Sequence, residues 1–491
     1  MKNFKIIIDN FSGGLTKYYW KSEYPSVGES GQAGMMRNCD ISDPSGLKPG
    51  PGSKITRGLA GLLRSIITTP FEANKTYAVG GLYLYQFVGD EMTVDGTYPY
   101  LILGNNPDCE DIKKVHFRIG GVDYIGMIFS LNESHQGNVG SYINGSIDPD
   151  WYKNYVYWGT GTIQFKTGVP HPIEVIGDGV TYIADGNQIV SIETIDIDVA
   201  HAGFSGQGSQ ALDLDYGFVI NGLKLYKNKL FITGNNPVLT GTTATKQGLY
   251  IYDLVSESYD GDFHQISKSG GTWIKDDTIF IFYEDITDEG TGILGYWDGY
   301  QIKKLTSWRG TIPQYYQVAE RDGALVWVSR VGSEDLIFSF KDGKLSQLAK
   351  GGYTTIGGIA LPFGKLMMGT ANGTTVYAMS TEDGFETDSD WKGLMQDITL
   401  GGRNGYTRKL KVTFAKIGQG AGAVVKLTDN KGNNLFNGTI SYPTDSGLTQ
   451  KIFRLGKKAQ NVRAEIDYSS FNPTSTIVFF KSIEIESNNI A

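Results

Sequence analysis

The sequence has few of the residues that build redox, metal and nucleophilic sites. It contains only 2 cysteines, Cys39 and Cys109, and their spacing gives no reason to expect a disulfide, so we expect free thiols. Its 5 histidines form no HxH, HExxH or HxxxH pair, and no Cys-x-x-Cys, G-x-S-x-G or phosphate-loop motif occurs. We therefore expect no catalytic residue, no cofactor and no metal, and predict that the chain is not an enzyme.

The chain also lacks a basic surplus and a long apolar run. Its 44 Lys and Arg residues against 52 Asp and Glu residues give a formal net charge of −8, which argues against a general nucleic-acid-binding surface. No apolar run approaches the roughly 20 residues needed to span a bilayer, so no membrane span is expected. Residues 1–9 (MKNFKIIID) contain only three consecutive isoleucines, which is too short an apolar run for a signal peptide. These features predict a chain made and kept in a cytoplasm.

Glycine and aromatic residues, in contrast, are abundant. The 491 residues include 65 glycines, 29 tyrosines and 23 phenylalanines, with only 20% charged residues. This composition is typical of an all-β protein with many tight turns. The length allows a large repeat domain and a smaller second domain.

Pairs of short β-strand patterns recur between about residues 60 and 380. The first predicted strand of each copy is centred near Tyr77, Tyr124, Tyr182, Phe231, Phe280, Val326 or Met367, at separations of 41 to 58 residues. Two copies carry Asp-Gly in the same predicted hairpin turn, at Asp298-Gly299 and at Asp342-Gly343, 44 residues apart. Asp-Gly suits a two-residue hairpin turn, in which both positions have positive φ. A period in the forties with about four short strands predicts a β-propeller of about seven blades over residues 56–390.

The pattern changes after Trp391 to longer alternating strands. They cover residues 409–417, 423–441, 463–470 and 476–487. Alternation such as that between Lys409 and Leu410 indicates strands that are buried on one face. We therefore predict a C-terminal β-sandwich or jelly-roll docking domain over residues 391–491.

Three acidic clusters have a spacing that calcium loops use. They are SIDPDWYKN (146–154), TIDIDVA (194–200) and DLDYG (213–217), and none has the full ligand set with a closing glutamate, which favours solvated turns. STEDGFETDSDW (380–391) imperfectly resembles the Ser-x-Asp-x-Gly-x-x-Trp turn of sialidases, but it occurs once and with shifted spacing. The sequence does not identify a glycosidase acid pair.

The N-terminal segment between Asn10 and Ser53 contains neither a good strand pattern nor a good helix pattern. It nevertheless carries Tyr18, Tyr19, Trp20 and Tyr24, which are costly to leave in water. We predict an extended N-terminal arm over residues 1–55. Its aromatic side chains would anchor either on a neighbouring subunit or on the chain's own propeller.

The same segment resembles the amino terminus of bacteriophage tail proteins of the nozzle (tail tubular protein B) type. The corresponding residues are Gly13, Gly14, Leu15, Pro25, Gln32, Asp43, Gly46, Leu47, Lys48 and Pro49. The second basic residue expected beside Lys48 is missing, because Pro49 and Gly50 occupy its place. The resemblance implies a β-propeller and a virion part, located in the tail and assembled in the host cytoplasm.

These features together predict a structural component of a bacteriophage tail, such as a ring-forming nozzle, hub or tail-tip protein. The expected partners are further copies in a homo-oligomeric ring and other phage tail proteins, with double-stranded DNA passing through the lumen. An acidic protein suits a DNA conduit, because attraction to phosphates would slow transit. The alternative is a carbohydrate-binding or carbohydrate-cleaving propeller for host recognition, which exposed aromatic residues and paired carboxylates at one mouth of the propeller would favour.

Overall fold

The structure is a computed structural model of the chain. It describes residues 3–8, 33–37, 39–40, 48–49, 51–67, 74–81, 83–89, 93–94, 100–101, 108–119, 121–132, 139–143, 152–154, 157–158, 161–162, 165–177, 179–193, 208–236, 248–262, 266–285, 287–350, 355–372, 375–385, 392–399, 405–415, 422–429, 433–458, 461–467 and 480–489.

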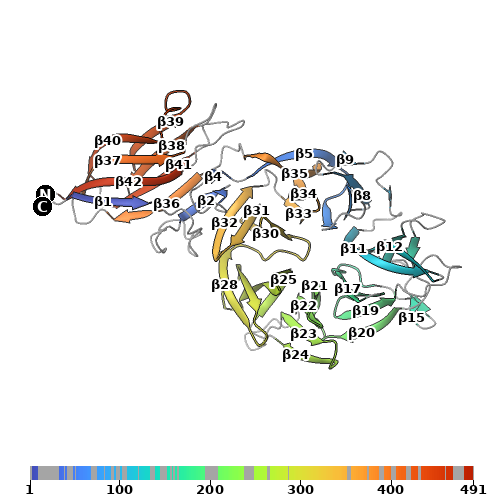
Figure 1. Cartoon of the computed structure of the whole chain (residues 1–491). Coiled ribbons are helices and arrows are strands. Elements are labelled where there is room, and N and C mark those ends of the chain that lie inside the picture. Colours follow the sequence, from blue (N-terminus) through green and yellow to red (C-terminus); the bar gives the residue numbers. More distant parts are fainter. Residues whose placement is uncertain are drawn as a thin grey trace.

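Antiparallel sheets follow one another along the chain and are arranged in a ring (Figure 1). The first sheet consists of β6 (Leu63–Ile66), β7 (Lys75–Gly80), β8 (Tyr83–Val88), β9 (Thr93–Val94) and β10 (Tyr100–Leu101). The second consists of β11 (Asp108–Ile119), β12 (Val122–Asn132), β13 (Val139–Ile143) and β14 (Tyr152–Asn154). The third consists of β17 (Ile173–Gly177), β18 (Val180–Asp185), β19 (Gln188–Glu193) and β20 (Gly208–Asp213). Between the last two of these sheets lies a small hairpin of β15 (Tyr157–Trp158) and β16 (Gly161–Thr162).

The ring continues with two units of four strands each. Asn235 of the first pairs with Lys268 of the second, so the two units form one eight-stranded sheet. They are β21 (Val219–Tyr226), β22 (Lys229–Asn235), β23 (Leu249–Asp253) and β24 (Ser258–Asp262), then β25 (Ile266–Lys275), β26 (Thr278–Asp285), β27 (Thr291–Trp297) and β28 (Ile302–Arg309). The last two units are β29 (Val318–Arg321), β30 (Ala324–Val331), β31 (Glu334–Lys341) and β32 (Lys344–Lys350), and β33 (Thr355–Ala360), β34 (Met367–Asn372) and β35 (Thr375–Phe385) with β5 (Pro51–Leu59).

The first strands of these units surround a central channel. In the order β6, β11, β17, β21, β25, β29 and β33, each of them contacts the next, and β33 contacts β6. Radial closure of this kind defines a β-propeller and leaves only short sheet edges. The predicted all-β fold with a β-propeller is confirmed.

The apolar faces of the sheets are buried between neighbouring units. One cluster joins Val326 and Ile337 of β30 and β31 to Ile359 and Met368 of β33 and β34. Another cluster joins Ile189 of β19 to residues of β21, β22 and β23 in the next unit around the ring. Because each sheet needs the next one to cover its face, stability rises only as the ring is completed.

The marker residues of the sequence repeat lie in the second strand of each unit. Tyr77, Tyr124, Tyr182, Phe231, Phe280, Val326 and Met367 fall in β7, β12, β18, β22, β26, β30 and β34. These strands are covered by sheets on both sides, and β30, for example, begins with six consecutive buried residues. The predicted strands are therefore equivalent to one another, but each is the second strand from the channel and not the first.

The ring closes between residues that are far apart in the sequence. β5 pairs antiparallel with β35, so that Leu59 lies opposite Val376 and Gly58 opposite Tyr377. At the neighbouring contact of β33 with β6, a Cβ atom on Gly357 would lie 2.0 Å from the carbonyl oxygen of Leu63. Only glycine permits this approach of the two backbones.

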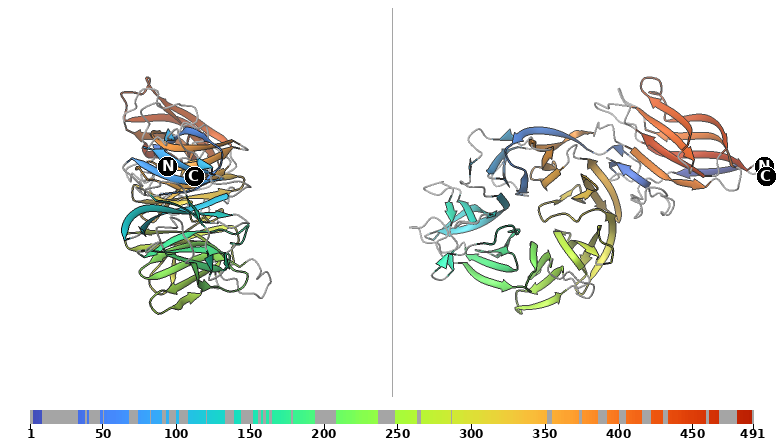
Figure 2. Two further views of the ribbon diagram at one scale, coloured as in Figure 1. Left: turned by 90° about the vertical axis from the view of Figure 1, so that its right-hand side faces the viewer. Right: turned by 180° about the vertical axis from the view of Figure 1, so that it is seen from behind.

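Two further sheets form a C-terminal unit beside the ring (Figure 2). One sheet has the order β1 (Asn3–Ile8), β42 (Phe480–Asn489), β37 (Gly405–Phe414), β40 (Gln450–Lys458); the other has the order β2 (Ala33–Arg37), β36 (Lys392–Thr399), β41 (Asn461–Asp467), β38 (Gly422–Asp429), β39 (Asn434–Ser441). Alternate residues such as Val412, Val425 and Ile483 are buried in one hydrophobic cluster, so the two sheets share a core.

The segment before the ring contributes strands to sheets formed by distant parts of the chain. β1 pairs with β42, and β2 pairs with β36, while β3 (Cys39–Asp40) pairs with β4 (Lys48–Pro49). The segment between Asn10 and Ser53 therefore contains strands, although its sequence shows no good strand pattern. These strands are short, and the pairing partners of β1 and β2 lie hundreds of residues away, so local sequence gives little sign of them.

The two Asp-Gly turns differ. Asp342 and Gly343 both have positive φ, 51° and 78°, and connect β31 to β32 as predicted for a two-residue hairpin. Asp298 begins a longer connection between β27 and β28, and only Gly299 of that pair has positive φ. The reason is local: the Asp298 carboxylate accepts hydrogen bonds from the backbone of Tyr300 and Gln301, which stabilises a wider turn.

Candidate functional site

The central channel of the propeller is crossed by the connection between β28 and β29. The hydroxyl of Tyr315 on this connection donates a hydrogen bond of 3.1 Å to the carbonyl oxygen of Glu110 in β11. The backbone of Gly271 in β25 donates to Pro313 O at 2.8 Å, and the backbone of Ile359 in β33 donates to Tyr316 O at 3.0 Å. Residues 313–316 are thus held by three different units of the ring.

Glycines on the first strands make room for this crossing. A Cβ atom on Gly270 would lie 2.2 Å from Pro313 O, and one on Gly222 would lie 3.2 Å from the Cβ of Tyr315. A side chain at Gly270 would therefore push the crossing segment out of the channel. The close approach explains Gly270 in β25, whereas at Gly222 in β21 the nearest atom to an added Cβ is Thr233 Oγ1, at 2.7 Å.

A cavity of about 420 Å³ lies in the channel against the crossing segment. Its lining includes Lys113, Glu174, Lys224, Trp273, Tyr315 and Tyr316, and we call it the aromatic cavity. The volume falls in the range of pockets that take small molecules, and the lining combines apolar rings with a few polar groups. Glu174 accepts hydrogen bonds from Lys224 Nζ at 2.9 Å and from the backbone of Leu225 at 3.0 Å.

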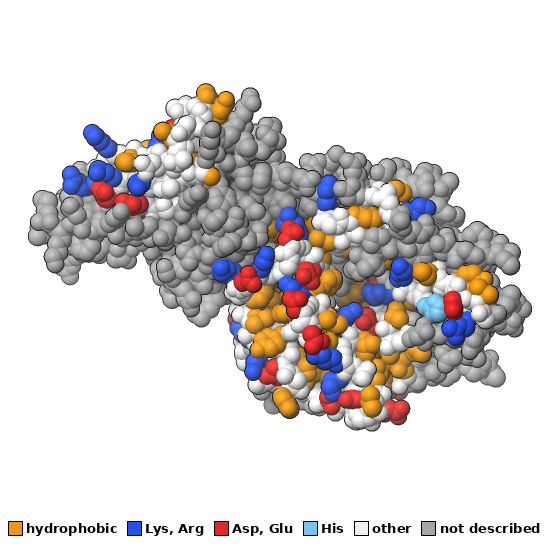
Figure 3. Space-filling model, viewed as in Figure 1, with side chains coloured by type: hydrophobic (Ala, Val, Ile, Leu, Met, Phe, Trp, Pro, Cys, Tyr) orange, Lys and Arg blue, Asp and Glu red, His pale blue; other side chains and the backbone are white. Residues whose placement is uncertain are grey.

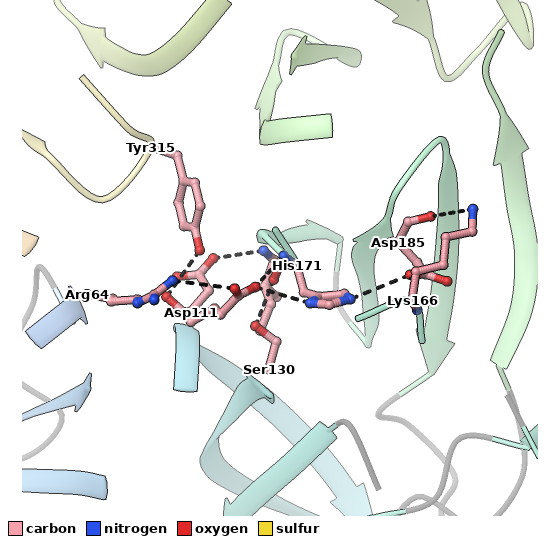
Figure 4. Close-up of polar contacts among 9 residues, drawn as sticks. Arg64, Asp111, Ser130, Lys166, His171, Asp185 and Tyr315 are labelled. Carbon is pink, nitrogen blue, oxygen red and sulfur yellow. Dashed lines mark hydrogen bonds and ion pairs between the residues drawn. The ribbon is translucent and has the colours of Figure 1, made fainter. Parts of the chain in front are cut away.

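Beside the channel, a buried histidine lies between two carboxylates (Figure 4). His171 Nδ1 is 3.1 Å from Glu110 Oε2, and the His171 backbone donates to the same oxygen at 2.7 Å. His171 Nε2 is 3.5 Å from Asp185 Oδ1, at ion-pair distance but without the geometry of a hydrogen bond. All three side chains are buried. This Glu110–His171–Asp185 group links the unit of β11 to the unit of β17.

Asp111 makes a second connection between the same units. Its Oδ1 accepts from Ser65 Oγ at 2.7 Å, and its Oδ2 accepts from the backbone of Ile173 at 2.8 Å. Lys113 Nζ lies 3.2 Å from Asp111 Oδ1. The buried carboxylate is therefore compensated by charge and by hydrogen bonds, as burial of a charge requires.

Burial and the nearby carboxylates change the pKa values of His171 and Tyr315. Burial alone would lower the pKa of His171, but the carboxylates of Asp185 and Glu110 raise it by more, so the pKa of His171 lies above its usual value. Burial, and then the negative charges of Asp111 and Glu110, raise the pKa of Tyr315 well above its usual value. Tyr315 therefore remains a neutral hydrogen-bond donor, and the two carboxylates favour the protonated form of His171.

The structure brings together residues that no sequence motif had marked. Glu110 and Asp111 are adjacent in β11, whereas His171 and Tyr315 come from connections, and only the ring places them side by side. The predicted arm anchors Tyr18, Tyr19, Trp20 and Tyr24 lie outside the described residues. So do most residues of the phage-like motif, of the clusters 146–154 and 194–200, and of the end of the turn 380–391.

The described residues form neither a metal site nor a membrane-spanning helix, and the acidic cluster 213–217 contacts another part of the chain. Among them, no group of three or more His, Cys, Asp or Glu side chains is placed to hold a metal ion. Asp215 of the cluster 213–217 accepts a hydrogen bond of 2.7 Å from the hydroxyl of Tyr250, a contact between side chains of the chain itself. No helix in the described ranges has the length and apolar character needed to cross a bilayer.

The fold is similar to several solved structures, although no protein-family model and no curated protein matches the sequence. The extracellular domain of BT4673 from B. thetaiotaomicron has a TM-score of 0.45 at 9% identity, over 82% of this chain and 56% of that one. The Cps50 (Swd1) β-propeller domain from Myceliophteria thermophila has a TM-score of 0.43 at 10% identity, over 67% of this chain and 100% of that one. The chain thus spans little more than half the length of the BT4673 domain.

An enzyme is also among the similar structures. Exo-β-1,3-galactanase from Phanerochaete chrysosporium has a TM-score of 0.30 at 11% identity, over 68% of this chain and 98% of that one. This finding contradicts the prediction that the chain is not an enzyme. The prediction used missing sequence motifs, and a site assembled from separate units of a ring would leave no such local motif.

The position of His171 between two carboxylates predicts a pH-dependent stability. A folded-state pKa above the unfolded value, which is about 6.5, gives stabilisation that is complete at low pH and is lost as the pH rises through the folded-state pKa. We expect His171→Gln to lower the free energy of unfolding by about 3–5 kcal/mol at low pH, because Glu110 and Asp185 lose their buried cation. The loss should shrink as the pH is raised, as measured by urea unfolding over a pH series.

His116→Gln is the matched control, because His116 lies in the same region on β11 and its side chain is partly exposed beside Asp123. It should change stability much less than His171→Gln. A His171→Gln deficit of equal size at every pH would show that the imidazole acts only by packing.

Proposed function

We propose that the chain is a structural component of a bacteriophage tail, in which several copies form a ring that docks other tail proteins. The N-terminal resemblance supports this proposal. The observation that carries it is the way the described strands connect the two parts of the chain: β1 and β2 add to the C-terminal sheets, and β5 adds to the last sheet of the propeller. The chain therefore enters and leaves the propeller through paired strands, an arrangement suited to a load-bearing part.

The proposed path for double-stranded DNA is the lumen of the oligomeric ring. The channel inside each propeller is crossed by Tyr315 and its neighbours, so it does not serve as the conduit. A lumen formed by subunits with a net charge of −8 would interact weakly with phosphates during passage. In this proposal the protein resides in the virion tail after assembly in the host cytoplasm.

The test of the tail proposal is assembly. Light scattering and negative-stain imaging of the purified chain should show rings of several copies, and antibodies against the chain should label the tail of the phage that carries its gene. The proposal fails if the chain stays monomeric at every concentration and no particle of that phage contains it.

A second candidate function is recognition of a carbohydrate, and the aromatic cavity favours it. Its rings, Trp273, Tyr315 and Tyr316, can cover the apolar face of a sugar, while Glu174, Lys113 and Lys224 offer hydrogen bonds to hydroxyl groups. The charges at this cavity nearly balance, because Lys224 pairs with Glu174 and Lys113 pairs with Asp111. A neutral sugar fits such a lining better than a strongly charged one.

A glycan array tests this second function, with product analysis for any glycan that binds. We expect Trp273→Ala to weaken binding of a captured sugar by about tenfold or more, since stacking of this ring would be lost. Tyr300→Ala, at an exposed turn outside the cavity, should bind as the unchanged chain does. Equal weakening by both substitutions, or no captured sugar, would remove the cavity as a carbohydrate site.

A further inference from the structure

Tyrosines gather where two neighbouring units of the ring meet, those of β17–β20 and β21–β24. The ring centre of Tyr259 on β24 is 5.5 Å from that of Tyr250 and 5.2 Å from that of Tyr252, both on β23. Tyr182 of β18 and Tyr252 pack from the two units against one hydrophobic cluster, in which Tyr250 is buried. Tyr216 lies in the connection that joins the two units, and we call these residues together the tyrosine patch.

Part of the tyrosine patch is open to solvent. Tyr216 is 88% exposed and Tyr259 is 44% exposed. The inner ring is held in place, because the hydroxyl of Tyr250 donates to Asp215 Oδ2 at 2.7 Å. The hydroxyl of Tyr259 donates to the carbonyl oxygen of Asp213 at 3.3 Å, which orients the outer ring. The patch therefore presents large, positioned aromatic rings on an open surface, as interaction sites do.

Exposed carboxylates lie beside these rings, those of Asp213, Asp215 and Glu257. Burial raises the pKa of Tyr259, and its neighbour Tyr252 adds to this effect. The carboxylates of Asp215 and Asp213 raise the same pKa further, because both lie near this ring. Burial and then Glu257 raise the pKa of Tyr252. Negative charge therefore lies close to both rings.

The charge of these three carboxylates is not compensated within the described part of the chain. There, no Lys, Arg or His side chain forms an ion pair with any of them. Lys229, on the adjacent β22, is already bound by Asp253 and Asp260. The tyrosine patch thus combines exposed aromatic rings with a local negative surplus.

We propose that the tyrosine patch docks a basic segment of a protein partner, with Lys or Arg side chains lying over the exposed rings. The face of an aromatic ring attracts a cation, and neighbouring carboxylates strengthen this attraction. The occupant follows from charge: an acidic segment would be repelled, and two copies of the patch facing each other would bring like charges together. A neutral sugar would cover the rings and leave the negative surplus unmatched.

The same combination of groups already holds a lysine elsewhere in the chain. Lys227 Nζ lies 4.9 Å from the centre of the Tyr226 ring and 2.6 Å from Asp277 Oδ2. A tyrosine face and a carboxylate thus share one ammonium group. Tyr259 with Asp213 offers the same two features to a cation of the partner.

The tyrosine patch is separate from the channel. In the two units the outermost strands are β20 and β24, whereas β17 and β21 border the channel. In Figure 3, hydrophobic side chains, a class that includes Tyr there, lie beside Asp and Glu side chains at the lower edge of the ring, where Figure 1 labels β23 and β24. A partner on the patch would therefore leave the aromatic cavity open, and the docking site depends on neither proposed function.

Titration calorimetry of the full chain with capped peptides of alternating glycine and arginine, or glycine and glutamate, tests the proposal at constant ionic strength. We expect the arginine peptide to bind and the glutamate peptide not to bind. Tyr259→Leu should weaken binding of the arginine peptide by about threefold to tenfold, because it removes the aromatic face and keeps an apolar side chain. Tyr259→Phe, which loses the same hydroxyl but keeps the ring, should retain binding.

Tyr216→Leu and Asp213→Asn change the same patch without touching the core, since both side chains are exposed. Each should weaken binding of the arginine peptide. The effect of Asp213→Asn should be larger at low salt, because screening weakens the attraction between exposed charges.

Tyr300→Leu and Asp322→Asn are the matched controls. Tyr300 is 91% exposed, and its neighbour Asp298 is already paired with Lys303 at 2.8 Å. Asp322 is an exposed carboxylate in the connection between β29 and β30. Both variants should bind the arginine peptide as the unchanged chain does. The proposal is overturned if the arginine peptide does not bind, if the glutamate peptide binds equally well, or if the patch variants, with unchanged thermal midpoints, bind as tightly as their controls.

Discussion

The pairing of β5 with β35 is the interaction on which the rest of the structure depends. It places residues 51–59 beside residues 376–385, more than three hundred positions later, and so completes the last sheet of the ring. Without a closed ring the first strands would not surround a channel, and the aromatic cavity would not exist. The same chain segment is preceded by β1 and β2, which belong to the C-terminal sheets. One short stretch of sequence thus connects both parts of the protein.

Ring closure also determines the chemistry of the channel. Glu110, His171 and Asp185 come from two neighbouring units, and the Tyr315 hydroxyl donates to the Glu110 carbonyl from the crossing segment. Tyr315 and Tyr316 of the crossing segment line the aromatic cavity, in which Lys224 pairs with Glu174.

The sequence predicts the second strand of each unit well and the first strand poorly. Strands such as β22 and β30 are buried on both faces and read as continuous apolar runs, which is the strongest local signal for a buried strand. The first strands border the channel and carry polar and glycine residues, as in ISKSGGTWIK of β25. Gly270 and Gly271 are needed there for the crossing segment, and this need comes from residues more than forty positions away.

The candidate site could not be predicted for a related reason. Glu110, His171 and Tyr315 are single residues of ordinary type, and their proximity depends on the order of the units around the ring. The turns were predictable where local chemistry decides, as at Asp342-Gly343, and not where a side chain stabilises a wider loop, as at Asp298. Local patterns therefore identify the repeat, while closure and the site depend on contacts between distant residues.

Hydrogen exchange of the intact chain tests ring closure most directly. If β5 is paired with β35, amides of residues 51–59 that bond to β35 should be protected to the same degree as their partners in residues 376–381. Fast exchange throughout residues 51–59, at the rate of an unpaired segment, together with slow exchange in β34, would contradict the account, because the last sheet would then stand without its closing strand.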